Sequence, residues 1–375
     1  MKNKKIMVIA TTDNMIWQFL IPHIQHMQSL GNTVHCVCAK TGFWFDELKD
    51  KYGFTVHEID FARNPFSIKN IKNYKKLKEL QKEENFDLVY CQQPVGGLMG
   101  RLIGKKFKIP VIYTAHGFHF YKGCPLKNKL MYKTVEKYLS KYTDHLITIN
   151  SEDFEAAKKM KAKHVYLING IGIDKNKMQV ENFDKDEFRK EIGLEKGDFA
   201  ILTISEMNKN KNYLTMLETI KILAKENGNI KFVSCGEGVW QEKIKQHAKN
   251  LGIESNCIFL GFRKDVAKII SVCDLFFHAS FREGLTLSVM EAMSAGKPCV
   301  VSNVRGNRDL IDDNKGGFIC EPTDAEGFAE KIKILMKDEN LRAKFGGYNK
   351  SKAQNYTVEF VKQQLEEIYE KINKK

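Results

Sequence analysis

Only 7 of the 375 residues are proline, and no stretch of the sequence is apolar over the length that a membrane span needs. The opening MKNKK leads directly into the short apolar segment KIMVIA, which lacks the longer apolar core of a signal peptide. We therefore expect the protein to stay in the cytoplasm. Hydrophobic residues make up 43% and charged residues 28% of the chain, which is typical of a folded globular protein. A length of 375 residues is too great for one ordinary core and predicts two domains.

The chain also lacks CxxC pairs, although it contains 9 cysteines. Several of them fall in apolar segments that are typical of buried strands, namely Cys36, Cys38, Cys91, Cys235 and Cys299. The scatter and the odd number argue against metal ligands and disulfides. We expect reduced thiols in the core.

Two functional signatures are absent. The loop after the first apolar segment has no G-x-G-x-x-G, which removes the main support for a dinucleotide-dependent dehydrogenase. No helix–turn–helix, RNA-binding or zinc signature accompanies the net charge of +14. A basic nucleic-acid-binding protein therefore stays an alternative that rests on charge alone.

Short apolar segments alternate with helical ones along the whole chain, which predicts doubly wound parallel sheets. In the first half we expect strands at 4–10, Thr33–Ala39, Thr55–Ile59, Leu88–Gln92, Val111–Ala115 and His145–Ile149. In the second half we expect them at Ala200–Ser205, Lys231–Cys235, Cys257–Leu260, Leu275–His278, Cys299–Ser302 and Gly317–Cys320. The glycines Gly96, Gly97, Gly100 and Gly104 fall along one helix and indicate close packing of that helix on a sheet.

The basic excess lies in the first half of the chain: residues 1–180 carry 29 Lys and Arg against 16 Asp and Glu, and residues 181–375 carry 31 against 30. A helix from Ile68 to Glu84 is expected to turn its lysines outward. Its inward residues would be Ile68, Ile71, Leu77 and Leu80. A solvated face explains such lysines, and so does contact with an anionic membrane surface.

The most informative stretch runs from Asp274 to Asn307 and reads as strand, loop, helix (about Thr286 to Ala295) and strand. The backbone N–H groups of residues 284–286 (Gly284, Leu285 and Thr286) would lie at the N-terminus of that helix. Unpaired N–H groups at a helix N-terminus attract an anion such as a phosphate. Glu283 and Glu291 are eight residues apart, so both carboxylates can face one site. The two carboxylates would lie at different depths of this site, and that of Glu291 can accept hydrogen bonds from ribose hydroxyls.

This Glu-x7-Glu stretch, within EGLTLSVMEAMSAGKPCVVS, resembles the signature of the family 4 glycosyltransferases. The resemblance implies a GT-B fold: two Rossmann-like α/β domains with parallel sheets facing across a cleft. It divides the chain into an acceptor domain (1–174), a nucleotide-sugar domain (175–355) and a C-terminal helix (356–375) that crosses back to the first domain. That helix carries a one-sided apolar stripe of Val358, Val361, Leu365, Ile368 and Ile372.

The resemblance also assigns residues in the first domain. The segment TAHGFHFYKG is similar to a loop of capsule and exopolysaccharide transferases, in which His116 matches a histidine that contacts the transferred sugar. Together with Glu283, His116 is the implied catalytic pair. His119 either lines the acceptor side or packs, and Thr12 and Asp13, from the polar loop that is expected to cap a helix over 15–30, are tentative acceptor residues.

The implied donor site is completed by loops of the second domain. Lys211, with Asn208 beside it, matches the lysine that grips the donor diphosphate, and Phe262 and Arg263 are placed near the uracil. Glu206 stands where the family usually has an arginine, and Lys209 or Arg282 would have to compensate. The D-x-D at residues 184–186 lacks a preceding strand, so we interpret it as an exposed linker and expect neither a metal nor another cofactor.

The resemblance therefore implies a retaining transferase that moves a hexose or N-acetylhexosamine from a UDP-sugar. The acceptor would be a polyprenyl-diphosphate-linked saccharide at the cytoplasmic face of the membrane, in capsule or exopolysaccharide synthesis. A UDP-sugar epimerase with two similar domains, which needs no acceptor, is the second alternative.

Overall fold

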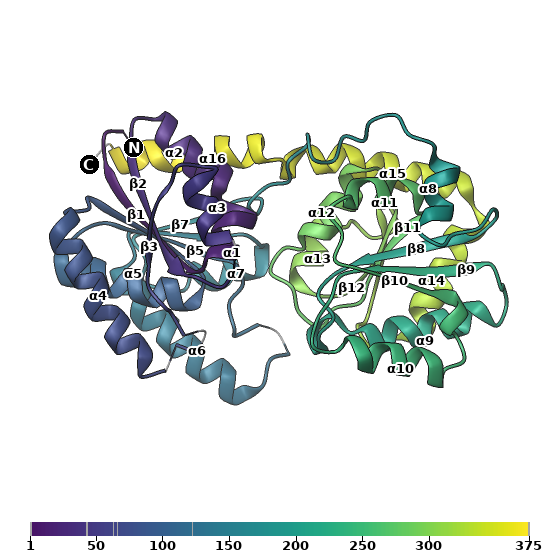
Figure 1. Ribbon diagram of the computed structural model, residues 1–375. Helices are drawn as coiled ribbons and strands as arrows, with labels where there is room; N and C mark the ends of the chain where they lie inside the picture. The colour runs from purple at the N-terminus through teal and green to yellow at the C-terminus, as the bar shows by residue number, and fades with distance from the viewer. Residues whose placement is uncertain (1, 43, 63, 66, 122, 374–375) are drawn as a thin grey trace. The chain divides into compact units, whose positions relative to one another are not determined.

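The computed structural model describes residues 2–42, 44–62, 64–65, 67–121 and 123–373. The chain forms two compact units: unit 1 contains Met1–Gly172 and Val358–Lys375, and unit 2 contains Ile173–Thr357. Each unit is built on one parallel sheet covered by helices (Figure 1). The α/β class that was predicted from the alternating segments is confirmed.

The sheet of unit 1 has seven strands in the order β3-β2-β1-β4-β5-β6-β7. The strands are β1 (Lys5–Thr12), β2 (Thr33–Ala39), β3 (Thr55–Glu58), β4 (Leu88–Gln92), β5 (Val111–Ala115), β6 (His145–Thr148) and β7 (His164–Leu167). The order reverses between β1 and β4: the chain runs from β1 outward to β2 and β3, then returns to β4 on the other side of β1 and continues to β7. Parallel α/β sheets bind ligands beyond the strand ends at such a point.

The first helix of unit 1 contains a π-helical turn that the sequence did not predict. The helices of unit 1 are α1 (Asp13–Met15), η1 (Ile16–Leu20), α2 (Ile21–Ser29), α3 (Trp44–Asp50), α4 (Lys69–Glu84), α5 (Pro94–Phe107), α6 (Leu126–Leu139), η2 (Ser140–Tyr142), α7 (Ser151–Ala157) and α16 (Val358–Asn373). The expected single helix over 15–30 is present as a continuous helical stretch over 13–29, in which Ile16–Leu20 form the π-helical turn η1. Thr12 occupies the N-cap position, but its side chain makes no capping hydrogen bond. π-helical turns occur often at functional sites.

The predicted inward face of α4 is wrong at its first turns. Ile68 and Ile71 are 78% and 61% exposed. Asn70 and Asn73 are buried in their place, and the Asn73 amide donates to the carbonyl of Asp60 at 2.6 Å. The apolar period could not reveal this, because the amides are buried through hydrogen bonds to the preceding loop.

The glycines of α5 confirm the predicted close packing of this helix on the sheet. A Cβ atom at Gly97 would overlap the ring of Tyr113 on β5, and one at Gly100 would lie 2.6 Å from the Cβ of Cys91 on β4. Absent side chains therefore let α5 approach β4 and β5.

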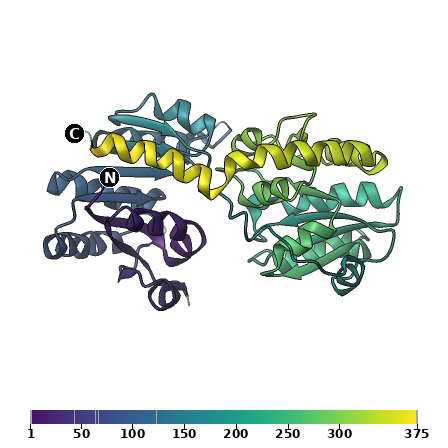
Figure 2. The same ribbon diagram turned by 90° about the horizontal axis from the view of Figure 1, so that it is seen from above.

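The final helix α16 belongs to unit 1 and lies along its other elements (Figure 2). Its residues Val361, Leu365 and Ile368 are buried. The side chain of Gln364 accepts a hydrogen bond from the backbone of Asn169 at 2.9 Å. The apolar stripe is thus packed against the first unit, although it comes from the other end of the sequence.

Unit 2 has six strands in the order β10-β9-β8-β11-β12-β13. They are β8 (Phe199–Ile204), β9 (Ile230–Cys235), β10 (Cys257–Gly261), β11 (Leu275–His278), β12 (Cys299–Ser302) and β13 (Gly317–Cys320). The helices are α8 (Lys185–Glu191), η3 (Lys209–Lys211), α9 (Tyr213–Ala224), α10 (Gln241–Asn250), η4 (Glu254–Asn256), α11 (Val266–Val272), α12 (Leu287–Ser294), α13 (Arg305–Leu310), α14 (Ala325–Lys337), α15 (Glu339–Lys352) and η5 (Ala353–Tyr356). The exposed Asp184 of the D-x-D caps α8 by accepting from the backbone of Asp186 at 2.9 Å.

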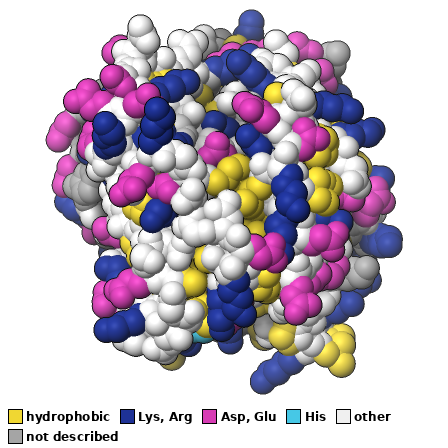
Figure 3. Space-filling view, turned by 90° about the vertical axis from the view of Figure 1, so that its right-hand side faces the viewer, with side chains coloured by type: hydrophobic (Ala, Val, Ile, Leu, Met, Phe, Trp, Pro, Cys, Tyr) yellow, Lys and Arg dark blue, Asp and Glu magenta, His cyan; other side chains and the backbone are white. Residues whose placement is uncertain are grey.

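Charge differs between the two units. Unit 1 carries 31 Lys and Arg against 19 Asp and Glu, whereas unit 2 carries 29 against 27. Figure 3 shows a face of unit 2 on which basic and acidic side chains are interspersed. All nine cysteines are free thiols, as predicted. Within the described ranges, no helix is long and apolar enough to cross a membrane.

Candidate active site

In unit 2 the strand order reverses between β8 and β11, and the loops after these two strands carry Lys211 and Glu283. Parallel strands end at the same edge of a sheet, so the two loops meet although 72 residues separate them. The Nζ atom of Lys211 lies 2.8 Å from Oε1 of Glu283. Sequence reasoning assigned Lys211 to the donor diphosphate and Glu283 to catalysis, but did not foresee that they form an ion pair.

A third residue, His278, completes this pair. Its Nε2 atom lies 3.0 Å from the same Oε1 atom, and its side chain is completely buried at the end of β11. Burial lowers the pKa of His278 despite the hydrogen bond to Glu283. Because a carboxylate only accepts, the neutral ring donates its Nε2–H. Sequence reasoning missed His278; its signal was one polar residue closing the apolar strand LFFH.

Glu283 is held ionised by these partners. Burial raises its pKa, but the attraction of Lys211 and the hydrogen bond from His278 outweigh that effect and bring the pKa well below its usual range. Both partners contact Oε1. The second oxygen of the carboxylate is therefore the one suited to accept from a ligand hydroxyl.

Asparagines hold the loop that carries Lys211. The side chain of Asn208 accepts from the backbone N–H of Lys211 at 3.2 Å and so caps the turn η3. Asn210 donates to the carbonyl of Arg282 at 2.9 Å, which ties this loop to the one that carries Glu283. Asn208 therefore positions Lys211 through the backbone. Glu206 is exposed, as is Lys209.

Residues 284–286 lead into α12, which begins at Leu287 rather than at Thr286. The hydroxyl of Thr286 donates to Asn307 Oδ1 at 2.8 Å, and Arg305 Nε donates to the carbonyl of Glu283 at 2.9 Å. Arg305 and Asn307 both belong to α13, so this helix holds the loop in place. The first N–H groups of α12 have no intrahelical acceptor, which suits them to an anion.

Glu291 lies eight residues after Glu283, within α12 and partly buried. Burial raises its pKa to about 7, against a smaller opposing attraction from Lys177. Glu291 is thus poised between its neutral and ionised forms, in contrast to Glu283. The environments of the two carboxylates therefore shift their pKa values in opposite directions.

The two residues expected near the base lie after β10. Phe262 is 62% exposed. Arg263 makes a bidentate pair with Asp265, with distances of 2.8 and 2.6 Å from Nε and Nη2 to the two carboxylate oxygens. The guanidinium is therefore fixed, and an exposed ring stands beside it.

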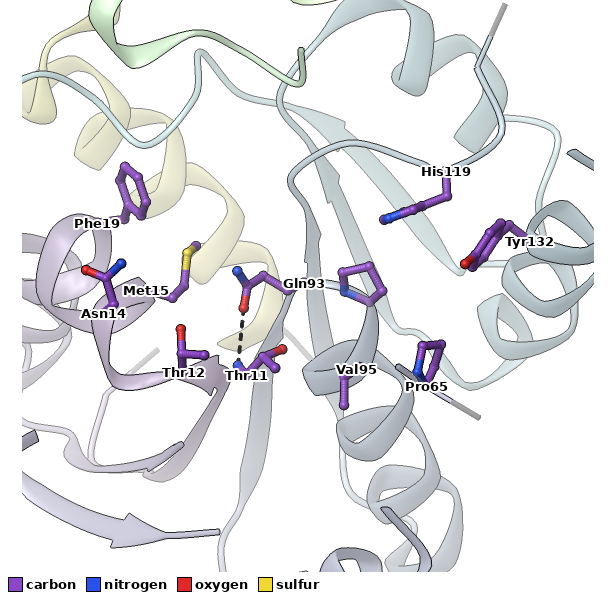
Figure 4. A pocket seen from close by; sticks show the side chains of 11 residues that line it. Thr11, Thr12, Asn14, Met15, Phe19, Pro65, Gln93, Val95, His119 and Tyr132 are labelled. Carbon is purple, nitrogen blue, oxygen red and sulfur yellow. Dashed lines mark hydrogen bonds between the residues drawn. The ribbon is translucent and has the colours of Figure 1, made fainter. Parts of the chain in front are cut away.

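Unit 1 has a cavity of about 400 Å³ at its own reversal point, between the ends of β1 and β4 (Figure 4). It is lined by Thr11, Thr12, Asn14, Met15, Phe19, Pro65, Gln93, Pro94, Val95, His119 and Tyr132. Gln93 accepts from the backbone of Thr11 at 3.2 Å and has a positive φ of 61°, an uncommon conformation for this residue type. Figure 4 shows Asn14 and Phe19 at one side of the cavity and His119 and Tyr132 at the other.

Of the three tentative acceptor residues, Thr12 and His119 line this cavity and Asp13 does not. Asp13 is fully buried, and its carboxylate accepts from the backbone N–H of Thr41 at 3.1 Å and from the Thr41 hydroxyl. Its role is to hold the loop after β2. Sequence reasoning missed the other lining residues, because they come together only at the strand-order reversal.

His116 follows β5 and is not part of the cavity lining. Its Nε2 atom lies 2.7 Å from Oε1 of Gln92. Burial, with a contribution from the charge of His23, lowers the pKa of His116 to about 4. The ring is therefore neutral at physiological pH, with Nε2–H donating to Gln92.

Comparison with known proteins decides which family these two sites belong to. Residues 184–352 match the group 1 glycosyl transferases, and residues 5–150 match the glycosyl transferase 4-like family. The chain is 32% identical over 372 residues to the putative glycosyltransferase EpsD of Bacillus subtilis, covering 98% of this chain and 96% of EpsD. The chain is a family 4 glycosyltransferase.

Two further comparisons describe relatives of this glycosyltransferase. An Escherichia coli enzyme named UDP-Gal:alpha-D-GlcNAc-diphosphoundecaprenol alpha-1,3-galactosyltransferase is 29% identical over 330 residues, covering 85% of this chain and 84% of the enzyme. The crystal structure of Anabaena HepE with UDP and glucose superimposes with a TM-score of 0.84 at 19% identity, covering 98% of this chain and 100% of that one. The fold of the glycosyltransferase is GT-B.

Membership of this family leaves the epimerase and the nucleic-acid-binding protein without support as principal functions. For the glycosyltransferase, the Lys211–Glu283–His278 cluster and Glu291 are the candidate donor residues, because they lie on the elements that the group 1 match covers.

Proposed function

We propose that this glycosyltransferase moves a hexose or an N-acetylhexosamine from a UDP-sugar to a saccharide carried on polyprenyl diphosphate, with retention of the anomeric configuration. The observation that carries the proposal is the Lys211–Glu283–His278 cluster at the strand-order reversal of unit 2. A relative whose name includes a UDP-galactose donor and a diphosphoundecaprenol-linked acceptor supports the two substrate classes.

In this proposal Lys211 and the N-terminus of α12 stabilise the negative charge that grows on the leaving diphosphate. Fixed donors aimed at developing charge are often the largest contribution to catalysis. Lys211 already faces the carboxylate of Glu283, so a diphosphate would share or replace that contact. These groups supply the charge that a metal ion supplies elsewhere, and we therefore propose a transfer that needs no bound metal.

Glu283 would accept a hydrogen bond from a hydroxyl of the transferred sugar through its second oxygen. Glu291 would accept hydrogen bonds from the ribose hydroxyls. In unit 1, the neutral ring of His116 would serve as a hydrogen-bonding partner of the sugar rather than as a positive charge. Phe262 offers an exposed ring on which a base could stack.

The cavity of unit 1 is proposed to receive the acceptor. Tyr132 of α6 and Pro65, which lies shortly before α4, belong to its lining. Both helices also expose apolar side chains: Leu126 and Leu130 of α6 are 71% and 63% exposed. Exposed lysines accompany them, namely Lys69, Lys72, Lys75, Lys76 and Lys82 on α4 and Lys127, Lys129, Lys133 and Lys137 on α6.

Apolar and basic side chains on the same helices suit the surface of an anionic membrane. Each nearby lysine contributes about 1 kcal/mol of attraction to such a leaflet, and the apolar side chains can enter it. We propose that α4 and α6 rest on the membrane that holds the lipid-linked acceptor. This would place the enzyme at the inner face of the cell membrane, in the synthesis of a capsule or exopolysaccharide.

The activity test uses a panel of UDP-sugars with a short polyprenyl-diphosphate N-acetylhexosamine as acceptor. The expected product has one added sugar by mass spectrometry and an α-anomeric proton by NMR. Glu283→Gln should abolish transfer, and EDTA should leave it intact. A β-linked product, a requirement for metal, or conversion of the UDP-sugar without acceptor would each overturn the corresponding part of the proposal.

Membrane contact is tested separately by flotation with vesicles of phosphatidylglycerol and with vesicles of phosphatidylcholine. Binding is expected to the anionic vesicles and should fall in the double variant Leu126→Ser/Leu130→Ser. Val239→Ser is the matched control, because Val239 is 89% exposed but lies in unit 2. Equal loss in the control, or equal binding to both vesicles, would refute the proposed surface.

A further inference from the structure

Two histidines and a glutamate converge at an edge of the unit 1 sheet, away from the residues assigned to sugar transfer. His35 is on β2, His57 is on the edge strand β3, and Glu84 ends α4. Val37 pairs with His57 across the two strands, and His35 lies two residues before Val37. Side chains alternate along a strand, so both imidazoles emerge on the same face of the sheet.

The possible ligand atoms are already close together. His35 Nδ1 lies 3.0 Å from His57 Nε2 and 3.9 Å from Glu84 Oε2, and all three atoms lie within 4.8 Å of one another. A zinc ion with bonds of about 2.0–2.1 Å to nitrogen and oxygen requires neighbouring ligand atoms roughly 3.3 Å apart. Small rotations of the side chains therefore suffice to bring these atoms around one ion.

The cluster is also restrained by its surroundings. His35 is 8% exposed, and its imidazole and the Phe86 ring pack in a T-shaped arrangement with centroids 5.2 Å apart. Leu77 and Leu80 of α4 pack in the same core cluster as Val37, which holds the helix against this face. Within the described ranges, this is the one group of three or more possible metal ligands.

We propose that His35, His57 and Glu84 bind one divalent transition-metal ion. Two imidazole nitrogens and one carboxylate oxygen suit Zn²⁺, Co²⁺ or Ni²⁺, with water completing the coordination. The ion would join the edge strand β3 to the end of α4, so its role is structural. This inference is independent of the proposed sugar transfer, which uses no residue of the cluster.

Lys5 makes the proposal sharper, because its ammonium group contacts Oε2 of Glu84. A metal ion and this ammonium compete for one carboxylate. The Lys5 side chain is 30% exposed and can swing into solvent. Removing its charge should therefore strengthen metal binding, whereas a bystander lysine would have no effect.

The experiment titrates Zn²⁺ and Co²⁺ into the full-length protein, freed of metal by EDTA and dialysis, with calorimetry and the Co²⁺ visible spectrum as readouts. We expect one equivalent of metal and an absorption spectrum typical of tetrahedral coordination. His57→Gln should weaken binding at least tenfold, and Lys5→Met should tighten it by up to about fivefold, the worth of an exposed ion pair.

His164→Gln is the matched control, because His145 and His164 stack with centroids 5.1 Å apart on β6 and β7 but belong to no three-ligand group among the described residues. It should bind metal as the wild type does. The proposal is overturned if His57→Gln binds metal as tightly as the wild type, if Lys5→Met leaves the affinity unchanged or weakens it, or if no saturable equivalent is bound. Lys5→Met keeps both imidazoles, so its result tests the proposal even if His57→Gln fails to fold.

Discussion

We expect the affinity of this glycosyltransferase for a UDP-sugar to weaken about tenfold between pH 8 and pH 6, because of Glu291. Burial raises the pKa of its carboxyl group from 4.5 to about 7. The proposed contact with ribose hydroxyls needs the ionised carboxylate as acceptor. At pH 6 about nine-tenths of the free protein would hold Glu291 protonated, and at pH 8 about one-tenth. Binding below pH 7 must therefore release a proton.

The same shift affects stability, with a sign that can be worked out. Folded Glu291 keeps its proton up to about pH 7, whereas the unfolded chain loses it near pH 4.5. Stability therefore falls as the pH rises from 4.5 to 7 and is constant above that. The cost at pH 8 is at most about 3 kcal/mol. Glu291→Gln should remove this cost while weakening nucleotide binding.

Calorimetry with UDP-glucose at pH 6, 7 and 8 measures the affinity, and a UDP-sugar is preferred to UDP because it lacks a terminal phosphate that titrates in this range. Repeating the titrations in two buffers of different ionisation enthalpy measures the released proton. Urea unfolding at pH 4.5 and pH 8 measures the stability. Glu242→Gln is the control, because that carboxylate is 89% exposed.

The reasoning fails if the wild type and Glu291→Gln show the same pH dependence of binding, since the titrating group would then lie elsewhere. The wild type is expected to lose free energy of unfolding between pH 4.5 and pH 8, and Glu291→Gln is expected to lose less. The reasoning also fails if both proteins lose the same amount. A Glu242→Gln protein that behaves like Glu291→Gln would mean that removing any carboxylate has the effect.

Three further predictions concern single contacts. His278→Asn should lower kcat about ten- to a hundredfold, because Glu283 loses a charge-assisted hydrogen bond. The Kd for UDP should stay nearly unchanged, and equal changes in kcat and Kd would indicate a general structural role. Gly97→Ala should lower the melting temperature, since its methyl would overlap a tyrosine ring of β5, whereas Gly347→Ala, in a helix with open space around it, should leave it unchanged or raise it. In unit 1 the buried Arg101 pairs with the buried Glu136 at 2.6 Å. Arg101→Ala should cost about 3–5 kcal/mol in urea unfolding because Glu136 would be left unpaired, and a loss below 1 kcal/mol would contradict this.

Local patterns were sufficient for much of the fold. Alternation of apolar segments located the strands, and β2, β4, β5, β11, β12 and β13 have the predicted bounds. A strand is recognised by its own residues and its flanking turns, which is local information. The same reasoning failed at Ile68 and Ile71, because exposure depends on what packs opposite a helix.

The amino-acid sequence by itself indicated the family and the two α/β units through local motifs and alternating segments. The candidates Glu283, Glu291, Lys211 and His116 followed from the resemblance that those motifs carry. Only the tertiary structure decided which of them lie within hydrogen-bonding distance of one another. Strand-order reversals bring loops 72 residues apart into hydrogen-bonding distance, and this made Lys211 and His278 the partners of Glu283. Burial then gave two carboxylates of one helix region opposite pKa shifts, because the free energy of a charge depends on the groups that surround it in space.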